Sequence, residues 1–204
     1  MKTASMPVRE ARAPTEEKKA GKPIRFLFDF RKALQAAAVL TKREPCEMIP
    51  RMRLLKLLYI ADREALKEIG CPITGDRFIA LPNGPVLSGL YEAMKGETQR
   101  SLAFEKCFTG IGYCVKLARS PGLSALNRYE IRKLQEVSDR CKDKDDWALS
   151  ELSHEFPEWK KHSSGQPSRS ISVEDVLEAV GRSGIAGKVR RNAELTKAVA
   201  ELWE

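Results

Sequence analysis

The residues best suited to chemistry form a polar stripe inside a leucine-rich segment. Lys56, Tyr59 and Asp62 follow one another at intervals of three residues, so in a helix they share one face. Helix rise places the first and last of them about 9 Å apart along the axis. Three interpretations fit the stripe: a buried polar network that fixes how helices meet, an exposed recognition face, or a catalytic pair. No cofactor motif accompanies the stripe, which disfavours catalysis.

Other patterns that indicate catalysis are absent from the sequence. It contains no G-x-x-x-x-G-K-[ST] phosphate loop, no H-E-x-x-H zinc motif and no G-x-S-x-G nucleophile turn. Gly110 and Gly112 form an isolated G-x-G pattern that a turn explains. His154 has no second ligand at helical spacing and is interpreted as a packing or capping residue. The sequence therefore predicts no enzyme, no cofactor and no metal site.

The cysteines and the apolar segments indicate a cytoplasmic protein. The five cysteines are scattered and form no C-x-x-C pair, which favours reduced thiols packed as small apolar residues: Cys46, Cys71, Cys107, Cys114 and Cys141. No segment approaches the roughly 20 apolar residues of a membrane helix, and the N-terminus lacks the apolar core of a secretory signal. We therefore expect cytoplasmic localisation and no membrane partner.

The chain is basic, with a formal net charge of +8 over 204 residues. Residues 1–25 carry seven Lys or Arg against three Glu, and elsewhere acidic and basic residues are interspersed. Such a charge fits a nucleic-acid partner or an acidic protein partner.

The pattern along the chain predicts a tail followed by one domain. Residues 1–23 lack periodic apolar positions and are expected to be disordered or loosely attached, so residues 24–204 form the single domain. Apolar spacing from Phe26 predicts a helix that ends near Lys42, and Met52–Ile69 predicts a central, largely buried helix that stops at Gly70. Residues 77–81 read as a short strand, and Pro85 is expected to open a helix that runs to Lys95.

The second half of the chain alternates helices with one hairpin. Residues 103–118 predict a β-hairpin that turns at Thr109–Gly112. Helices are predicted over 128–141, capped by Asn127 with Glu130, and from Asp145 or Asp146 through His154. After a polar loop at 163–170, Ser172 caps a helix through Val180. A last helix runs over Lys188–Trp203, with its apolar residues expected to face inward: Val189, Leu195, Val199 and Leu202. The predicted fold is mostly α, a compact helical domain with a short β-hairpin or extended segments.

The two C-terminal helices also give a loose helix-turn-helix outline. Lys188, Arg190 and Arg191 open the second helix, as in a DNA-reading unit. The turn is longer than the usual three or four residues, so DNA binding is the alternative function and not the first.

Four blocks of sequence resemble the Panacea domain, the SocA-like family of bacterial and phage antitoxins. The blocks are LLKLLYIADREAL (54–66), GCPITGD (70–76), FIALPNGPV (78–86) and LSELSHEFPEW (149–159). Positions that match the family pattern are Lys56, Tyr59, Asp62, Gly75, Asp76, Ala80, Gly84, Pro85, Val86, His154 and Trp159. Several of these are expected to be structural, with Gly84 needed for its backbone and Trp159 as a core anchor.

The resemblance implies a mostly helical antitoxin that neutralises a toxin protein, encoded by an adjacent gene, through direct contact. SocA itself resembles a protease adaptor, so blocking of the toxin and delivery to a protease both stay open. The alternative is a DNA-binding regulator of its own operon. We expect the partner surface in the irregular segment Thr74–Asn83, since recognition residues often lie on loops held by a rigid scaffold: Asp76, Arg77, Phe78, Ile79 and Asn83. The competing interpretation is that Asp76 caps a local turn and Arg77 is only solvated.

Overall fold

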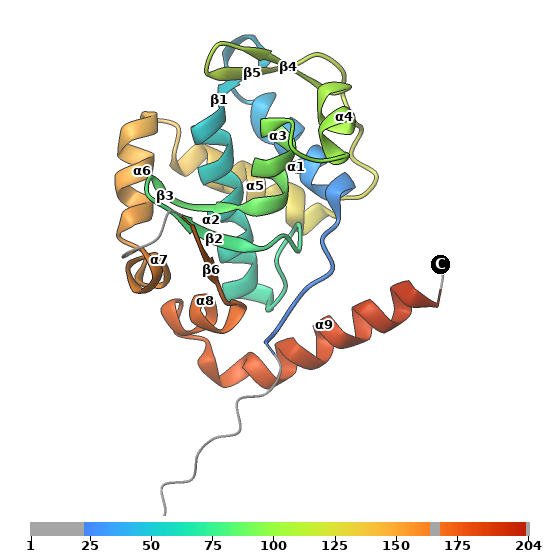
Figure 1. Ribbon diagram of the computed structural model, residues 1–204, viewed down its shortest axis with the longest axis vertical. Helices are drawn as coiled ribbons and strands as arrows, with labels where there is room; N and C mark the ends of the chain where they lie inside the picture. The colour runs from blue at the N-terminus through green and yellow to red at the C-terminus, as the bar shows by residue number, and fades with distance from the viewer. Residues whose placement is uncertain (1–22, 164–167, 203–204) are drawn as a thin grey trace, which may run out of the picture.

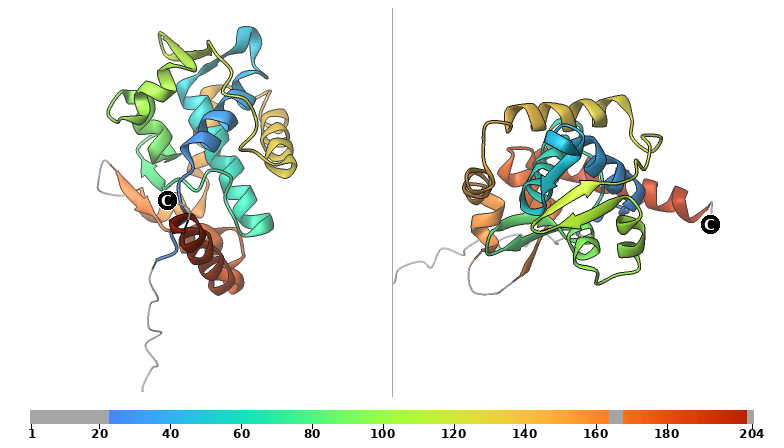
Figure 2. Two further views of the ribbon diagram at one scale, coloured as in Figure 1. Left: turned by 90° about the vertical axis from the view of Figure 1, so that its right-hand side faces the viewer. Right: turned by 90° about the horizontal axis from the view of Figure 1, so that it is seen from above.

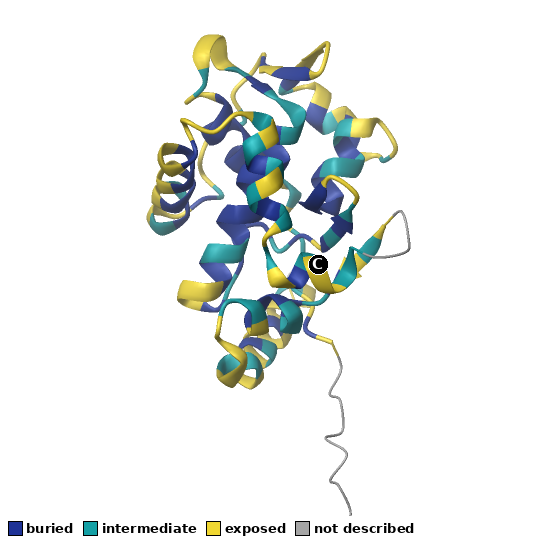
Figure 3. Ribbon diagram, turned by 90° about the vertical axis from the view of Figure 1, so that its left-hand side faces the viewer, coloured by how far each residue is buried: buried dark blue, intermediate teal, exposed yellow. Residues whose placement is uncertain are grey.

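A long central helix organises the fold. The computed structural model describes residues 23–163 and 168–202; the predicted tail, apart from Pro23, lies outside them. Helix α2, Arg51–Ile69, ends at Gly70 in the left-handed conformation, which glycine adopts without strain. Its leucines are buried on several faces (Figure 3). Around it pack helices α1 (Phe30–Thr41), α5 (Arg128–Arg140) and α6 (Asp146–His154) and strand β3 (Gly84–Leu87) (Figure 1). The predicted central helix is therefore confirmed.

Helix α1, Phe30–Thr41, packs on α2 and on α5, Arg128–Arg140. The prediction that α1 begins near Phe26 is wrong. The side chain of Asp29 accepts a hydrogen bond from the backbone N–H of Lys32 at 2.9 Å and caps the helix there. The residues before Asp29 run in an extended conformation along the body of the protein (Figure 1). The capping box of Asn127 and Glu130 at the start of α5 is confirmed.

In the described residues, two small antiparallel sheets accompany the helices, so the fold is mostly α and not all-α. The first has the order β1-β5-β4, with bounds Met48–Pro50, Cys114–Leu117 and Phe108–Ile111. It contains the predicted hairpin, but the turn lies at Gly112 and Tyr113 and not at Thr109–Gly112, because Thr109, Gly110 and Ile111 pair with β5 in strand β4. The second has the order β3-β2-β6, with bounds Gly84–Leu87, Phe78–Leu81 and Arg169–Ile171. Strand β6 lies partly in the segment 163–170 that the sequence assigned to a loop.

Pro85 does not open a helix. It lies in β3 opposite Ala80 of β2, and helix α3, Ser88–Lys95, begins three residues later. The pairing with β2 holds this segment extended, and the Asp76 carboxylate accepts the N–H groups of Gly89 and Leu90 at 2.9 and 3.1 Å at the true helix start. A tertiary contact therefore sets the helix boundary.

The remaining helices are short except for the last. Helices α6, Asp146–His154, and α8, Val173–Ala179, were predicted with their caps, whereas α4, Arg100–Glu105, and α7, Pro157–His162, were not. Two 3-10 turns cover Pro45–Glu47 and Ser183–Ile185.

Helix α9, Ala186–Glu201, extends away from the body (Figures 1 and 2). Val189 is buried as expected, but Leu195, Val199 and Leu202 are exposed. The expectation that all four face inward is wrong because only the first half of the helix packs on the rest of the fold.

Candidate partner-binding site

Lys56 of the polar stripe is buried beneath the β2–β3 hairpin. Its Nζ donates a hydrogen bond to the carbonyl oxygen of Pro85 at 3.0 Å, and burial lowers its pKa to about 7. Gly84 has φ +95°, and a Cβ there would come within 2.4 Å of both Lys56 Nζ and Ser153 Oγ. Glycine is therefore required at this position, as the sequence indicated, because no side chain fits between α2 and α6.

Tyr59 joins α2 to α7 through a buried carboxylate. Its hydroxyl donates to Glu158 Oε1 at 3.0 Å, and Arg63 Nε donates to the same oxygen at 2.6 Å. The guanidinium of Arg63 also lies 4.3 Å from the centre of the Phe156 ring, which stacks on Tyr59. Glu158 is 1% exposed, so two donors satisfy a charge that burial alone would make costly.

Asp62 fixes the loop between α2 and β2. Its carboxylate accepts the backbone N–H groups of Ile73 and Thr74 at 3.0 and 3.1 Å, and the Thr74 hydroxyl at 2.5 Å. Burial raises the pKa of this carboxyl to about 7 against the opposing effect of these hydrogen bonds. The stripe is thus a buried polar network, and its interpretation as an exposed recognition face is wrong.

His154 and Trp159 hold the outer side of the hairpin. Their rings stack with centres 4.1 Å apart, and Trp159 Nε1 donates to the carbonyl oxygen of Leu81 at 2.9 Å. Trp159 is only half-buried, so it anchors strand β2 at the edge of the core and not in its centre. Burial lowers the pKa of His154.

The structure divides the predicted contact residues into two groups. Asp76 and Phe78 are buried, with Asp76 bound to backbone N–H groups and Phe78 packed edge-on against Tyr59. Neither side chain is exposed on the outer face of the hairpin, and both instead line a cavity beside Arg77, so the prediction that they belong to an exposed contact surface is wrong. Arg77 and Asn83 are exposed and Ile79 is half-buried. Gly75, with φ +70°, lets the chain pass within contact of Leu27.

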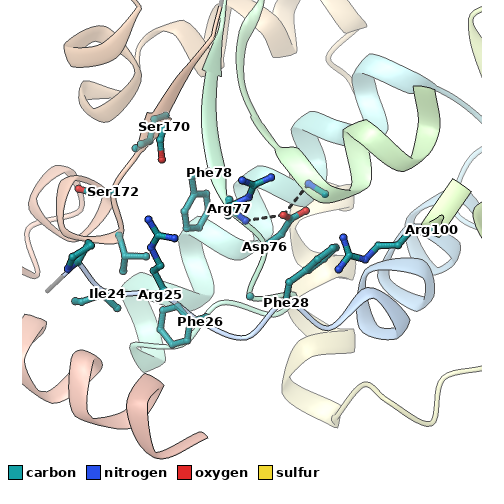
Figure 4. A pocket seen from close by; sticks show the side chains of 15 residues that line it. Ile24, Arg25, Phe26, Phe28, Asp76, Arg77, Phe78, Arg100, Ser170 and Ser172 are labelled. Carbon is teal, nitrogen blue, oxygen red and sulfur yellow. Dashed lines mark hydrogen bonds between the residues drawn. The ribbon is translucent and has the colours of Figure 1, made fainter. Parts of the chain in front are cut away.

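A cavity of about 600 Å³ lies beside Arg77 (Figure 4). Its walls come from the extended residues 23–28, the segment 75–78, the starts of α3 and α4, and residues 170–173. Charged and aromatic side chains line it: Arg25, Arg77, Arg100, Phe26, Phe28 and Phe78. Sequence reasoning found Arg77 and Phe78 but missed the others, because five separate segments meet here and no sequence spacing connects them.

The described part of the chain shows no grouping of three or more His, Cys, Asp and Glu side chains that could hold a metal ion. Within the same residues, no helix has the length and apolar character needed to cross a membrane. Two accessible features of the described residues lie close to the predicted contact segment: the exposed end of the β2–β3 hairpin and the arginine-lined cavity.

One family model matches the chain. The family described as antitoxin SocA-like, Panacea domain, matches residues 54–160, which span the central helix, both hairpins and the His154–Trp159 pair. Neither a curated protein nor a solved structure shows a significant match to the chain.

Proposed function

The chain belongs to the SocA-like antitoxin family with the Panacea domain, and we propose that it neutralises a cognate toxin protein by direct binding in the cytoplasm. The family match over half of the chain is the observation that carries the proposal. The toxin is the product of an adjacent gene, and no small molecule is turned over. The burial of Lys56 and Asp62 supports a binding role, because both side chains are held away from any substrate.

The proposed contact surface is the exposed part of the β2–β3 hairpin and the segment that leads into it. Arg77, Ile79 and Asn83 are its accessible members. Buried contacts hold this segment from both sides, through Asp62 on the loop and Trp159 on strand β2. A rigid scaffold beneath accessible residues reduces the entropy lost on binding.

The test is rescue of growth by co-expression with the product of the adjacent gene. The wild-type chain should restore growth and co-purify with the toxin, and Arg77→Glu should weaken both. Arg132→Glu is a matched control, since each arginine is about two-thirds exposed, 68% and 67%, and has one carboxylate partner in an ion pair. Both variants should melt like the wild type, because exposed ion pairs contribute little.

If the wild-type chain neither rescues growth nor binds any adjacent gene product, the antitoxin proposal fails. If Arg77→Glu folds and neutralises as well as Arg132→Glu, the proposed surface is wrong while the function stands.

The second candidate function is a DNA-binding regulator of its own operon. Helix α9 favours it, because the helix projects from the body and exposes Lys188 and Arg191 near its start. Duplex DNA from the region upstream of the gene should then bind in a salt-dependent way. Loss of that binding in Lys188→Glu/Arg191→Glu, with rescue retained, would assign α9 to DNA and the hairpin to the toxin.

Blocking of the toxin and delivery to a protease are both consistent with neutralisation. The half-life of the toxin in cells separates them. Delivery shortens the half-life when the antitoxin is co-expressed, and blocking leaves it unchanged or longer.

A further inference from the structure

The cavity beside Arg77 is positively charged, because three arginines line it. Arg25 and Arg100 are exposed, and neither has an acidic partner among the residues that the structure describes. In Figure 4, Arg25 rises from the N-terminal segment, and Arg100 points toward Phe28 from the opposite side. Arg77 contributes a third guanidinium, whose pair with Glu92 at 3.1 Å is exposed and therefore weak.

The nearby carboxylates in the described part of the chain do not form ion pairs with Arg25 or Arg100, because they already have other hydrogen-bond partners. Asp76 is buried and its carboxylate is engaged by the backbone N–H groups of Arg77, Gly89 and Leu90. Glu174 accepts the N–H of Ile24 and the guanidinium of Arg190, both at 2.9 Å. The cavity therefore presents two arginines, Arg25 and Arg100, that have no carboxylate partner among the described residues and can pair with one from a ligand.

The shape of the cavity is already set in the free protein. A Cβ on Gly89 would lie 2.4 Å from the ring of Phe28, and a Cβ on Gly75 would lie 2.3 Å from the carbonyl oxygen of Leu27. These glycines let the N-terminal segment pack directly on the body. The segment is also tied down where Asp29 N–H donates to the carbonyl oxygen of Thr74 at 2.9 Å.

Aromatic side chains lie beside the arginines in the wall of the cavity (Figure 4). Phe26, Phe28 and Phe78 line it, and the guanidinium of Arg100 lies 5.0 Å from the centre of the Phe28 ring, a favourable cation–π distance. Arginine held over an aromatic ring keeps its donors free for a carboxylate. The volume of about 600 Å³ falls in the roughly 300–1,000 Å³ range of ligand pockets.

We propose that this cavity receives an acidic segment of the cognate toxin, with its carboxylates paired to Arg25 and Arg100 and an apolar side chain against the phenylalanines. The proposal rests on the proposed antitoxin function and names the chemistry of its partner. The chain's own residues 1–22 are a poor occupant, because they carry six Lys or Arg against three Glu. Duplex DNA is disfavoured, since a cavity of about 600 Å³ is too small to admit a duplex and its phenylalanines offer no contact to a phosphate backbone.

The test uses the full chain and the purified toxin. Arg25→Glu/Arg100→Glu should weaken toxin binding by about tenfold for each reversal. The control Lys116→Glu/Arg132→Glu makes the same change in net charge at exposed positions away from the cavity and should bind within about threefold of the wild type. Arg25→Gln/Arg100→Gln should show a smaller loss in the same direction, which keeps the test valid if the reversed pair folds poorly.

Exchanging the charges between the two proteins identifies the toxin segment that enters the cavity. Overlapping peptides that cover the toxin should include an acidic one that binds the wild-type chain and not the cavity variant. Changing its Asp and Glu residues to Lys in the intact toxin should restore binding to Arg25→Glu/Arg100→Glu.

The outcomes are distinct. Equal toxin binding by the cavity variant and its control overturns the cavity proposal and leaves the antitoxin function standing. If Arg25→Glu/Arg100→Glu loses duplex-DNA binding but still binds the toxin, the cavity proposal is overturned in favour of a phosphate ligand. Failure of the wild-type chain to bind the toxin overturns both proposals.

Discussion

Replacing Glu158 with alanine tests whether the buried polar network holds the C-terminal helices on the core. Its carboxylate accepts one hydrogen bond from Tyr59 and two from Arg63, at 3.0, 2.6 and 3.4 Å. The Glu158 side chain is 0% exposed and that of Arg63 15%. Glu158→Ala leaves a buried hydroxyl and a largely buried guanidinium without their acceptor. Breaking a buried pair in this way costs about 3–5 kcal/mol.

Urea denaturation measures this cost, and thermal melting should show a fall of roughly 10 °C for a chain of this size. Tyr59→Phe removes one donor only and should cost about 1 kcal/mol. The two losses should not add, because both act on one carboxylate. Glu155→Ala is the control, since Glu155 is 74% exposed in its pair with Lys160, and it should leave the melting temperature unchanged. A loss below about 1 kcal/mol for Glu158→Ala would refute the structural role given to the network.

Three further predictions concern the core, the tail and the buried lysine. Leu58 is 1% exposed, so Leu58→Ala should cost about 2–5 kcal/mol in urea denaturation; no loss would mean that the helix face is not core. Deleting residues 2–22 should leave the melting temperature nearly unchanged, because their sequence has no periodic apolar positions and almost nothing to bury, and a large fall would show that the tail packs on the domain. Burial lowers the pKa of Lys56 from 10.5 to about 7, so between these pH values the unfolded chain holds the extra proton. The free energy of unfolding should rise with pH there, by up to about 1.4 kcal/mol per unit. Lys56→Met should flatten that rise, and an unchanged slope would contradict the burial of a neutral lysine.

Local signals allowed much of the fold to be predicted. The capping box at Asn127 and the stop at Gly70 depend on residues close in sequence, and both were found. Strands β1 and β6 are three residues long and exist through pairing with distant partners, so no periodic pattern marks them. The predicted start of α1 was too early because Phe26 continues the apolar spacing of the helix. In the structure, contacts with the segment 74–75 hold the residues before Asp29 in an extended conformation.

The site was harder to predict than the fold. Sequence spacing placed Lys56, Tyr59 and Asp62 on one helix face, but only the packing of the β2–β3 hairpin and α7 shows that this face is buried. The exposed residues Leu195 and Val199 followed a helical pattern that predicts burial, yet α9 has no neighbour along that half in the described structure. Burial depends on which surfaces meet, and the spacing of residues within one helix does not show that.

Neutralisation by direct contact can be tested by light scattering on a size-exclusion column with the full chain and its purified toxin. If the two proteins bind directly, they should form a complex of fixed stoichiometry without added nucleotide, metal or protease. Arg77→Glu should shift the mixture toward the separate proteins, whereas Arg132→Glu should not. If the two proteins elute independently at every ratio while the co-expressed chain still protects cells, neutralisation does not occur by direct contact.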